Sequence, residues 1–108
     1  DDVIIHYTPG HSMGHVTIQL LDEQSDRKVL FTGDHFCLSN KHKILGYTSR
    51  FSSSYSAQIK SVRYLKDLDF EWVLPGHGRP YCFPKRDAHT REELIENAAS
   101  NMEQGLLD

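Results

Sequence analysis

The chain has 108 residues, a formal net charge of -3 and ordinary hydrophobic and charged contents of 38% and 25%, which are typical of one small globular domain or part of one. No apolar run approaches the roughly 18 residues of a membrane-spanning helix, and the acidic start lacks the pattern of a signal peptide. The acidic balance argues against nucleic-acid binding. Two cysteines, Cys37 and Cys82, make no disulfide framework, whereas seven histidines are many for this length.

The first half of the chain predicts three strands followed by a long loop. Residues 3–7 form a short apolar run that a Thr-Pro-Gly turn ends, and residues 16–20 alternate apolar with polar side chains. That alternation is typical of a half-buried strand. Residues 28–32 predict a third strand, ended by Gly33, and residues 36–54 read as an irregular loop long enough to suggest a function.

The second half predicts a helix, a strand and a helix, which completes a mixed α/β pattern with the strands concentrated first. Residues 55–68 carry an apolar stripe at helical spacing: Tyr55, Ile59, Val62, Leu65 and Leu68. Residues 71–74 predict a strand. Thr90 and Glu93 have the spacing of a capping box, so a last helix should begin near Thr90 and end before Gly105. Its buried face should comprise Leu94, Ile95, Ala98, Ala99 and Met102.

Three segments share one form, in which a predicted strand ends, a glycine turn follows and a metal-capable side chain comes next. These side chains are His11, Asp34 and His77. Strand ends hold ligands rigidly yet leave one side open, as a catalytic metal requires. Two imidazoles and a carboxylate suit Zn, Fe or Mn, and a carboxylate can bridge two metals.

The sequences of these segments are TPGHSMGH at residues 8–15, LFTGDH at 30–35 and LPGHG at 74–78. In order and context they resemble the later motifs of the metallo-β-lactamase-fold hydrolase superfamily, which includes the glyoxalase II type. The resemblance spans the whole chain. It implies that His11 binds one metal, that His77 binds the other and that Asp34 bridges both.

One motif of that superfamily is absent from these 108 residues, namely the early HxHxDH that supplies most of the metal ligands. The superfamily fold is a four-layer αββα sandwich of two halves. The resemblance therefore implies that residues 1–108 are the C-terminal portion of such a domain, with an α/β (α+β) fold that is half of the sandwich. The missing N-terminal half, or a partner chain, would be needed to complete the site.

The resemblance implies a metal-dependent hydrolase in which a metal-bound hydroxide attacks an ester, thioester or related bond of a small-molecule substrate. Two Zn²⁺ ions, or Fe or Mn, would occupy an intact site, with Asp34 fixing their separation and orienting the hydroxide. The stretch before residue 75 is similar to plant and cyanobacterial members, so a cytoplasmic or plastid location would fit. The alternative is a non-catalytic remnant or interaction module of the same fold.

Three further interpretations concern residues beside these candidate ligands. The letters GHSMG at 10–14 also match the GxSxG nucleophile elbow, with Ser12 as nucleophile, although the strand pattern after it disfavours the helix that an elbow requires. His15 could hold the first ligand, His11, in position, because ligating histidines commonly need a hydrogen-bond partner. His35, directly after Asp34, could line the mouth of the site.

Overall fold

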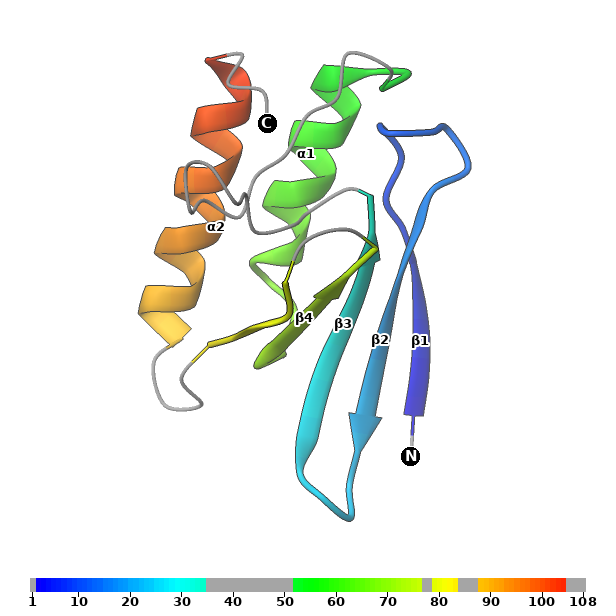
Figure 1. Ribbon diagram of the computed structural model, residues 1–108, viewed down its shortest axis with the longest axis vertical. Coiled ribbons are helices and arrows are strands. Elements are labelled where there is room, and N and C mark those ends of the chain that lie inside the picture. Colours follow the sequence, from blue (N-terminus) through cyan, green and yellow to red (C-terminus); the bar gives the residue numbers. More distant parts are fainter. Residues whose placement is uncertain (1, 35–51, 77–78, 84–87, 105–108) are drawn as a thin grey trace.

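The computed structural model describes residues 2–34, 52–76, 79–83 and 88–104, with only the backbone described for 88–90. In chain order the elements are β1 (Asp2–Tyr7), β2 (Val16–Asp22), β3 (Arg27–Gly33), α1 (Tyr55–Leu65), β4 (Trp72–Pro75), β5 (Tyr81–Cys82) and α2 (Ala88–Glu103). The strands form one sheet in the order β1-β2-β3-β4-β5. Among the strands of the described ranges, β3 and β4 alone pair in parallel, with α1 in the connection between them (Figure 1). The mixed α+β class expected from the sequence is confirmed.

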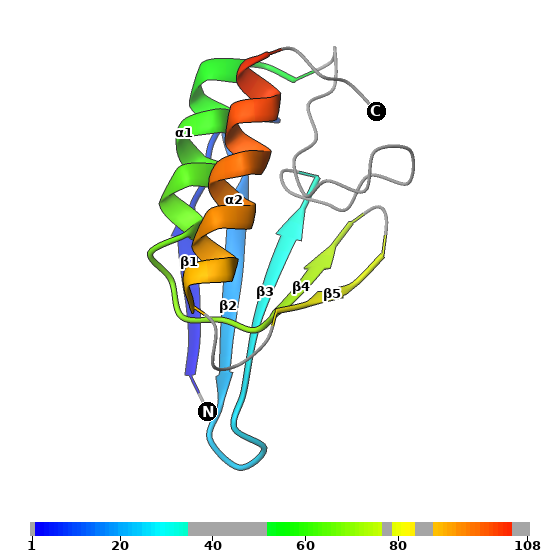
Figure 2. The same ribbon diagram turned by 90° about the vertical axis from the view of Figure 1, so that its left-hand side faces the viewer.

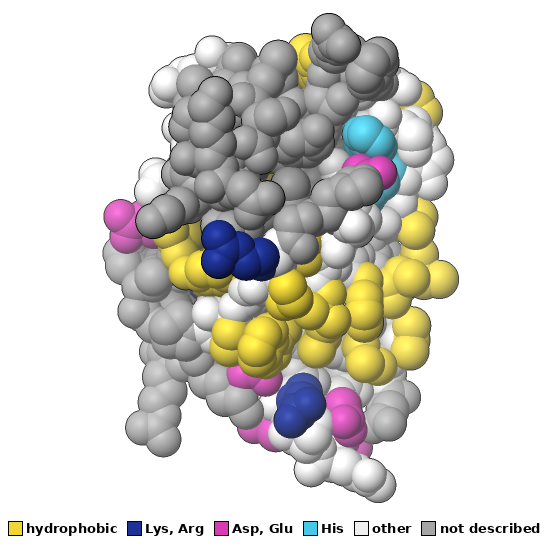
Figure 3. All heavy atoms as spheres, in the orientation of Figure 1, with side chains coloured by type: hydrophobic (Ala, Val, Ile, Leu, Met, Phe, Trp, Pro, Cys, Tyr) yellow, Lys and Arg dark blue, Asp and Glu magenta, His cyan; other side chains and the backbone are white. Residues whose placement is uncertain are grey.

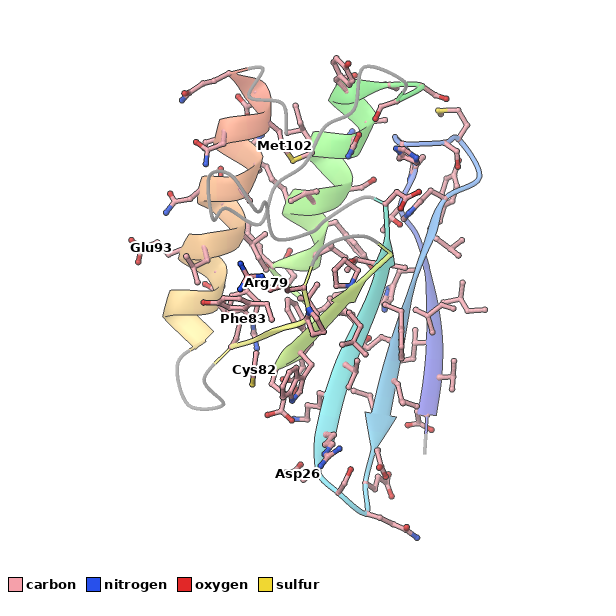
Figure 4. All side chains as sticks on the ribbon, in the orientation of Figure 1. Asp26, Arg79, Cys82, Phe83, Glu93 and Met102 are labelled. Carbon is pink, nitrogen blue, oxygen red and sulfur yellow. The ribbon has the colours of Figure 1, made fainter. Side chains whose placement is uncertain are left out.

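The two helices lie side by side on one face of this sheet, and the core fills the space between them and the strands (Figure 2). Figure 4 shows Met102 of α2 on the side toward α1. The buried cluster joins both helices to β3, β4 and the segments beside them, and it comprises Leu30, Val62, Leu65, Phe70, Val73, Phe83, Ile95, Ala98, Ala99 and Met102. The predicted buried face of the last helix is confirmed, with Leu94 packed at the edge of this cluster. No helix in the described ranges has both the length and the apolar character needed to cross a membrane.

The alternation in β2 predicted a half-buried strand correctly, and its buried side is the polar one. Thr17 and Gln19 are 0% and 5% exposed, whereas the apolar Val16 and Ile18 are 41% and 36% exposed. Gln19 pairs with Leu30 of the core, so the polar positions of β2 face the helices. The apolar positions face the other side of the sheet.

That other side, here called the open face, is apolar across four strands. One row of paired residues consists of Ile5, Ile18, Phe31 and Leu74, and the next consists of Val3, Leu20, Val29 and Trp72. Val3 and Ile5 are about two-thirds exposed, and Phe31 and Trp72 are exposed as well. Hydrophobic side chains accordingly gather over the strands in Figure 3. The open face thus leaves large apolar side chains in contact with solvent.

The first helix begins where predicted but ends three residues earlier, at Leu65, and a turn follows. Ser54 caps it, because its hydroxyl accepts a hydrogen bond from the Ala57 N–H at 3.2 Å. Val62 and Leu65 are buried as the stripe predicted, but Tyr55 is 42% exposed and Gln58 is fully buried instead.

Four smaller predictions need correction or lie outside the described part, and one strand was not predicted. The fourth strand runs one residue later than expected, and β5 was not predicted because it has only two residues. The last helix begins at Ala88, so Thr90 lies inside it and cannot be its N-cap. Gly105 and most of the long loop 36–54 fall outside the described residues.

Candidate metal centre

The predicted ligand segments converge on one end of the sheet. The loop of residues 8–15 between β1 and β2, the end of β3 and the end of β4 lie there together, next to the start of α1 (Figure 1). β1 and β2 are antiparallel, while β3 and β4 are parallel. This topology brings the loop between β1 and β2 and the ends of β3 and β4 to the same end of the sheet.

His11 and Asp34, which are 23 positions apart in the chain, meet at this edge. His11 Nε2 lies 3.4 Å from Asp34 Oδ2, and the two side chains are 26% and 37% exposed. Ligands about 2.0–2.1 Å from a tetrahedral zinc ion lie about 3.3–3.4 Å from each other. The separation is therefore long for an ion pair's hydrogen bond but fits two donors on one metal, and the pair remains accessible from solvent.

Gly76 brings the end of β4 against the same carboxylate. Its N–H donates to the Gly33 carbonyl at 2.7 Å, and a β-carbon at this position would lie 2.9 Å from Asp34 Oδ1. His77 is the next residue in the chain, but its position lies outside the described residues. Within the described ranges, no three His, Cys, Asp or Glu side chains form a group that could hold a metal ion. The described residues thus bring together two of the three predicted ligand side chains, His11 and Asp34.

The start of α1 holds the His11 loop through contacts that no sequence pattern predicted. The N–H groups of Ser53 and Ser54 donate to the carbonyls of His11 and Gly10 at 3.1 and 2.9 Å. The Ser52 hydroxyl lies 3.4 Å from His11 Nδ1, on the ring side opposite Asp34. Serines just before an apolar helical stripe are a signal for a helix start, but nothing in the pattern shows which loop that start will meet.

His15 lies beside the His11–Asp34 pair, with its ring nearly perpendicular to that of His11 and 6.5 Å away between centroids. Its Nδ1 is 3.0 Å from the hydroxyl of Thr8, which is fully buried and in turn contacts the Thr17 hydroxyl at 3.0 Å. Partial burial holds the pKa of His15 below its ordinary value, and the nearby His11 imidazole acts in the same direction. This shift of the pKa favours the neutral form of the His15 ring. His35 lies outside the described residues.

Ser12 does not occupy a nucleophile elbow. Its carbonyl accepts hydrogen bonds from the N–H groups of Gly10 and His15, which close the turn, and the strand β2 follows at Val16. An elbow needs a strand before it and a helix after it. The serine-hydrolase interpretation is therefore wrong.

The fold agrees with the comparisons to known proteins. The sequence model of the metallo-beta-lactamase superfamily matches residues 1–77, so the chain belongs to this superfamily. No curated protein matches the chain.

Several solved structures have the same fold. A metallo-beta-lactamase family protein from Thermus thermophilus superposes with a TM-score of 0.62 at 21% identity, over 94% of this chain and 30% of its own. A metallo-beta-lactamase from Staphylococcus aureus subsp. aureus COL gives 0.62 at 23% identity, over 98% and 34%. An archaeal superfamily protein from Sulfolobus tokodaii gives 0.57 at 22% identity, over 88% and 32%. The chain thus spans about a third of the length of these proteins.

Proposed function

We propose that this chain is the C-terminal portion of a metal-dependent hydrolase that cleaves an ester, thioester or related bond in a small molecule. The observation that carries the proposal is the 3.4 Å approach of His11 Nε2 to Asp34 Oδ2 at the exposed end of the sheet. Membership of the superfamily supports it, because this fold is a hydrolase fold whose members generally bind metal ions.

The roles of the individual residues follow from their donor chemistry. His11 would hold a metal through Nε2, with the Ser52 hydroxyl beside its Nδ1. Asp34 has two carboxylate oxygens, of which Oδ2 faces His11 and Oδ1 faces Gly76, so it could serve two metals at once. His77 would be the donor on the Gly76 side. A bound zinc ion would supply Lewis acidity and lower the pKa of a water to near neutrality.

We further propose that the remaining ligands come from a second sheet that covers the open face. The apolar rows of β1–β4 provide a surface that a domain core would bury, with Ile5 and Phe31 exposed along its length. The segment that covers it would be the N-terminal half of the same domain or a partner chain. Such a layer would end beside the edge that carries His11 and Asp34.

Metal content tests this function directly. Asp34→Ala in the purified protein should lower bound zinc and hydrolysis of ester and thioester substrates together, and a chelator should abolish the same activity. Asp69→Ala is the matched control, because this carboxylate lies beside Lys28 at 2.6 Å, near the opposite end of β3. A zinc-depleted Asp34→Ala protein with full activity would exclude the proposal.

A further inference from the structure

We propose that His15 is a positioning residue that fixes the Asp34 turn against the loop that carries His11. The inference rests on the proposed function, since it concerns the spacing of two donors to one metal centre. In this role the His15 imidazole is a spacer between Thr8 and Gly33, rather than a third ligand.

On one side, the His15 ring is attached to Thr8 at the end of β1. The Thr8 hydroxyl lies 3.0 Å from His15 Nδ1, and the Thr8 N–H donates to the His15 carbonyl at 3.0 Å. Side chain and backbone of His15 are therefore both joined to the same residue. Thr8 is itself fully buried and hydrogen-bonded to Thr17 of β2. A buried anchor of this kind fixes the ring, because a rotation would break a satisfied hydrogen bond.

The second side of the spacer meets Gly33, at the end of β3. A β-carbon on Gly33 would lie 2.8 Å from His15 Nε2, so the imidazole occupies the space where any other residue would place its side chain. Gly33 also has a φ of +58°, a left-handed conformation that favours glycine. The close approach and the backbone conformation both require glycine here, and Asp34 follows directly.

The consequence concerns the two donors on either side. His11 lies three residues before Gly14, in the loop that ends at His15. Asp34 directly follows Gly33, which is the glycine that His15 contacts. Since β2 lies between β1 and β3, pairing within the sheet sets their spacing, and the ring that contacts both Thr8 and Gly33 fixes the Asp34 turn against the loop that carries His11. With Ala at position 15 this contact would be lost, and the 3.4 Å donor separation would be held less firmly. Misplacement of donors weakens metal binding, as loss of supporting residues does generally, by about 10–100-fold.

Zinc affinity of the purified protein, measured by competition with a chromophoric chelator, tests this role. His15→Ala should raise the zinc dissociation constant about 10–100-fold. Thr8→Val, which keeps the shape and removes the hydroxyl, should change it in the same direction by less. His6→Ala is the matched control, because His6 also has both ring nitrogens engaged, with Tyr64 and Gln19 at 2.9 Å each, but lies in β1 away from the pair. Thermal unfolding of each variant verifies that it is folded.

The outcomes separate the two proposals. Wild-type zinc affinity in a folded His15→Ala protein would overturn the role of His15 and leave the proposed function standing. A wild-type protein that includes the layer proposed to cover the open face, yet binds neither zinc nor iron nor manganese, would refute the proposed function itself. A double-mutant cycle in the metal-free protein adds a readout that needs no metal. The change that Thr8→Val makes in the unfolding constant should shrink at least about threefold when His15 is already Ala. Additive effects would contradict the spacer.

Discussion

The backbone of Gln58 occupies the space that a side chain at position 10 would need. A β-carbon on Gly10 would lie 2.3 Å from Gln58 Cα and 2.4 Å from its N, and Gly10 has a φ of +148°. The loop that carries His11 is thus pressed directly against the first turns of α1. Ser61 strengthens this contact by donating from its hydroxyl to the Pro9 carbonyl at 2.8 Å.

Gly10→Ala should therefore destabilise the protein strongly. The clash is with helix backbone, which cannot move aside, and the positive φ adds strain, so we expect a loss of at least about 2 kcal/mol in the free energy of unfolding. Urea unfolding measures it. Gly14→Ala is the control, because nothing lies within 4 Å of a β-carbon there. Equal effects of the two substitutions would contradict the contact.

The ion-pair cluster between the helices should make stability depend on acid pH. Glu96 of α2 accepts from Arg63 Nε at 3.0 Å and from Lys66 Nζ at 3.2 Å. Partial burial alone would raise the pKa of Glu96, but the hydrogen bonds from Arg63 and Lys66 outweigh it and hold the pKa below its ordinary value. The unfolded chain therefore takes up this proton first as the pH falls.

Glu96→Gln should accordingly lower stability at pH 7, and the difference from the wild type should shrink as the pH falls below the ordinary glutamate pKa of about 4.3. The pair is more than a third exposed, so we expect less than about 1 kcal/mol, decreasing with added salt. Urea unfolding at pH 7 and pH 3.5 measures it. Glu92→Gln, at an exposed position of the same helix, is the control. A difference that grows as the pH falls would contradict the sign.

The open face should behave as a surface and not as a core. Ile5→Lys should cost the 108-residue chain less than about 0.5 kcal/mol of stability, because Ile5 is 67% exposed. Leu30→Ala, on the helix side of the same sheet, should cost about 2–5 kcal/mol. Ile5→Lys should also reduce self-association in sedimentation velocity. A large loss of stability on Ile5→Lys would show that this face is buried within the chain itself.

The open face also marks where sequence reasoning reached its limit. Period-2 alternation locates β2, but the alternation is the same whichever side is covered. The apolar side is exposed, while Thr17 and Gln19 are buried because they have hydrogen-bond partners within the chain: Thr17 bonds Thr8, and Gln19 donates to the Asp69 carbonyl at 2.8 Å. Thr8 is nine positions from Thr17 and Asp69 is 50 positions from Gln19, so no local sequence pattern predicts these hydrogen bonds.

In the candidate site, too, the sequence predicted the local features but not the contacts between distant parts of the chain. Glycine turns after strands located His11 and Asp34, since a strand end with a flexible turn is a local feature. The supports of these residues come from elsewhere in the chain, through Ser52 and Ser53 at the start of α1 and Gln58 within it. Which helix meets which loop depends on how the layers pack, so these supports became visible only in the folded structure.

Gly76 provides a final prediction, because its close contact is with a movable group. A β-carbon there would lie 2.9 Å from Asp34 Oδ1, whereas the nearest backbone atoms, of Gly33, are 3.3 Å away. In Gly76→Ala the partly exposed carboxylate should swing aside, which costs little stability but displaces the proposed bridging ligand. We expect a stability change below about 1 kcal/mol and a zinc affinity reduced about tenfold, measured by urea unfolding and chelator competition. Gly14→Ala should alter neither quantity. If Gly76→Ala bound zinc as the wild type does, Asp34 would not be a ligand held against Gly76.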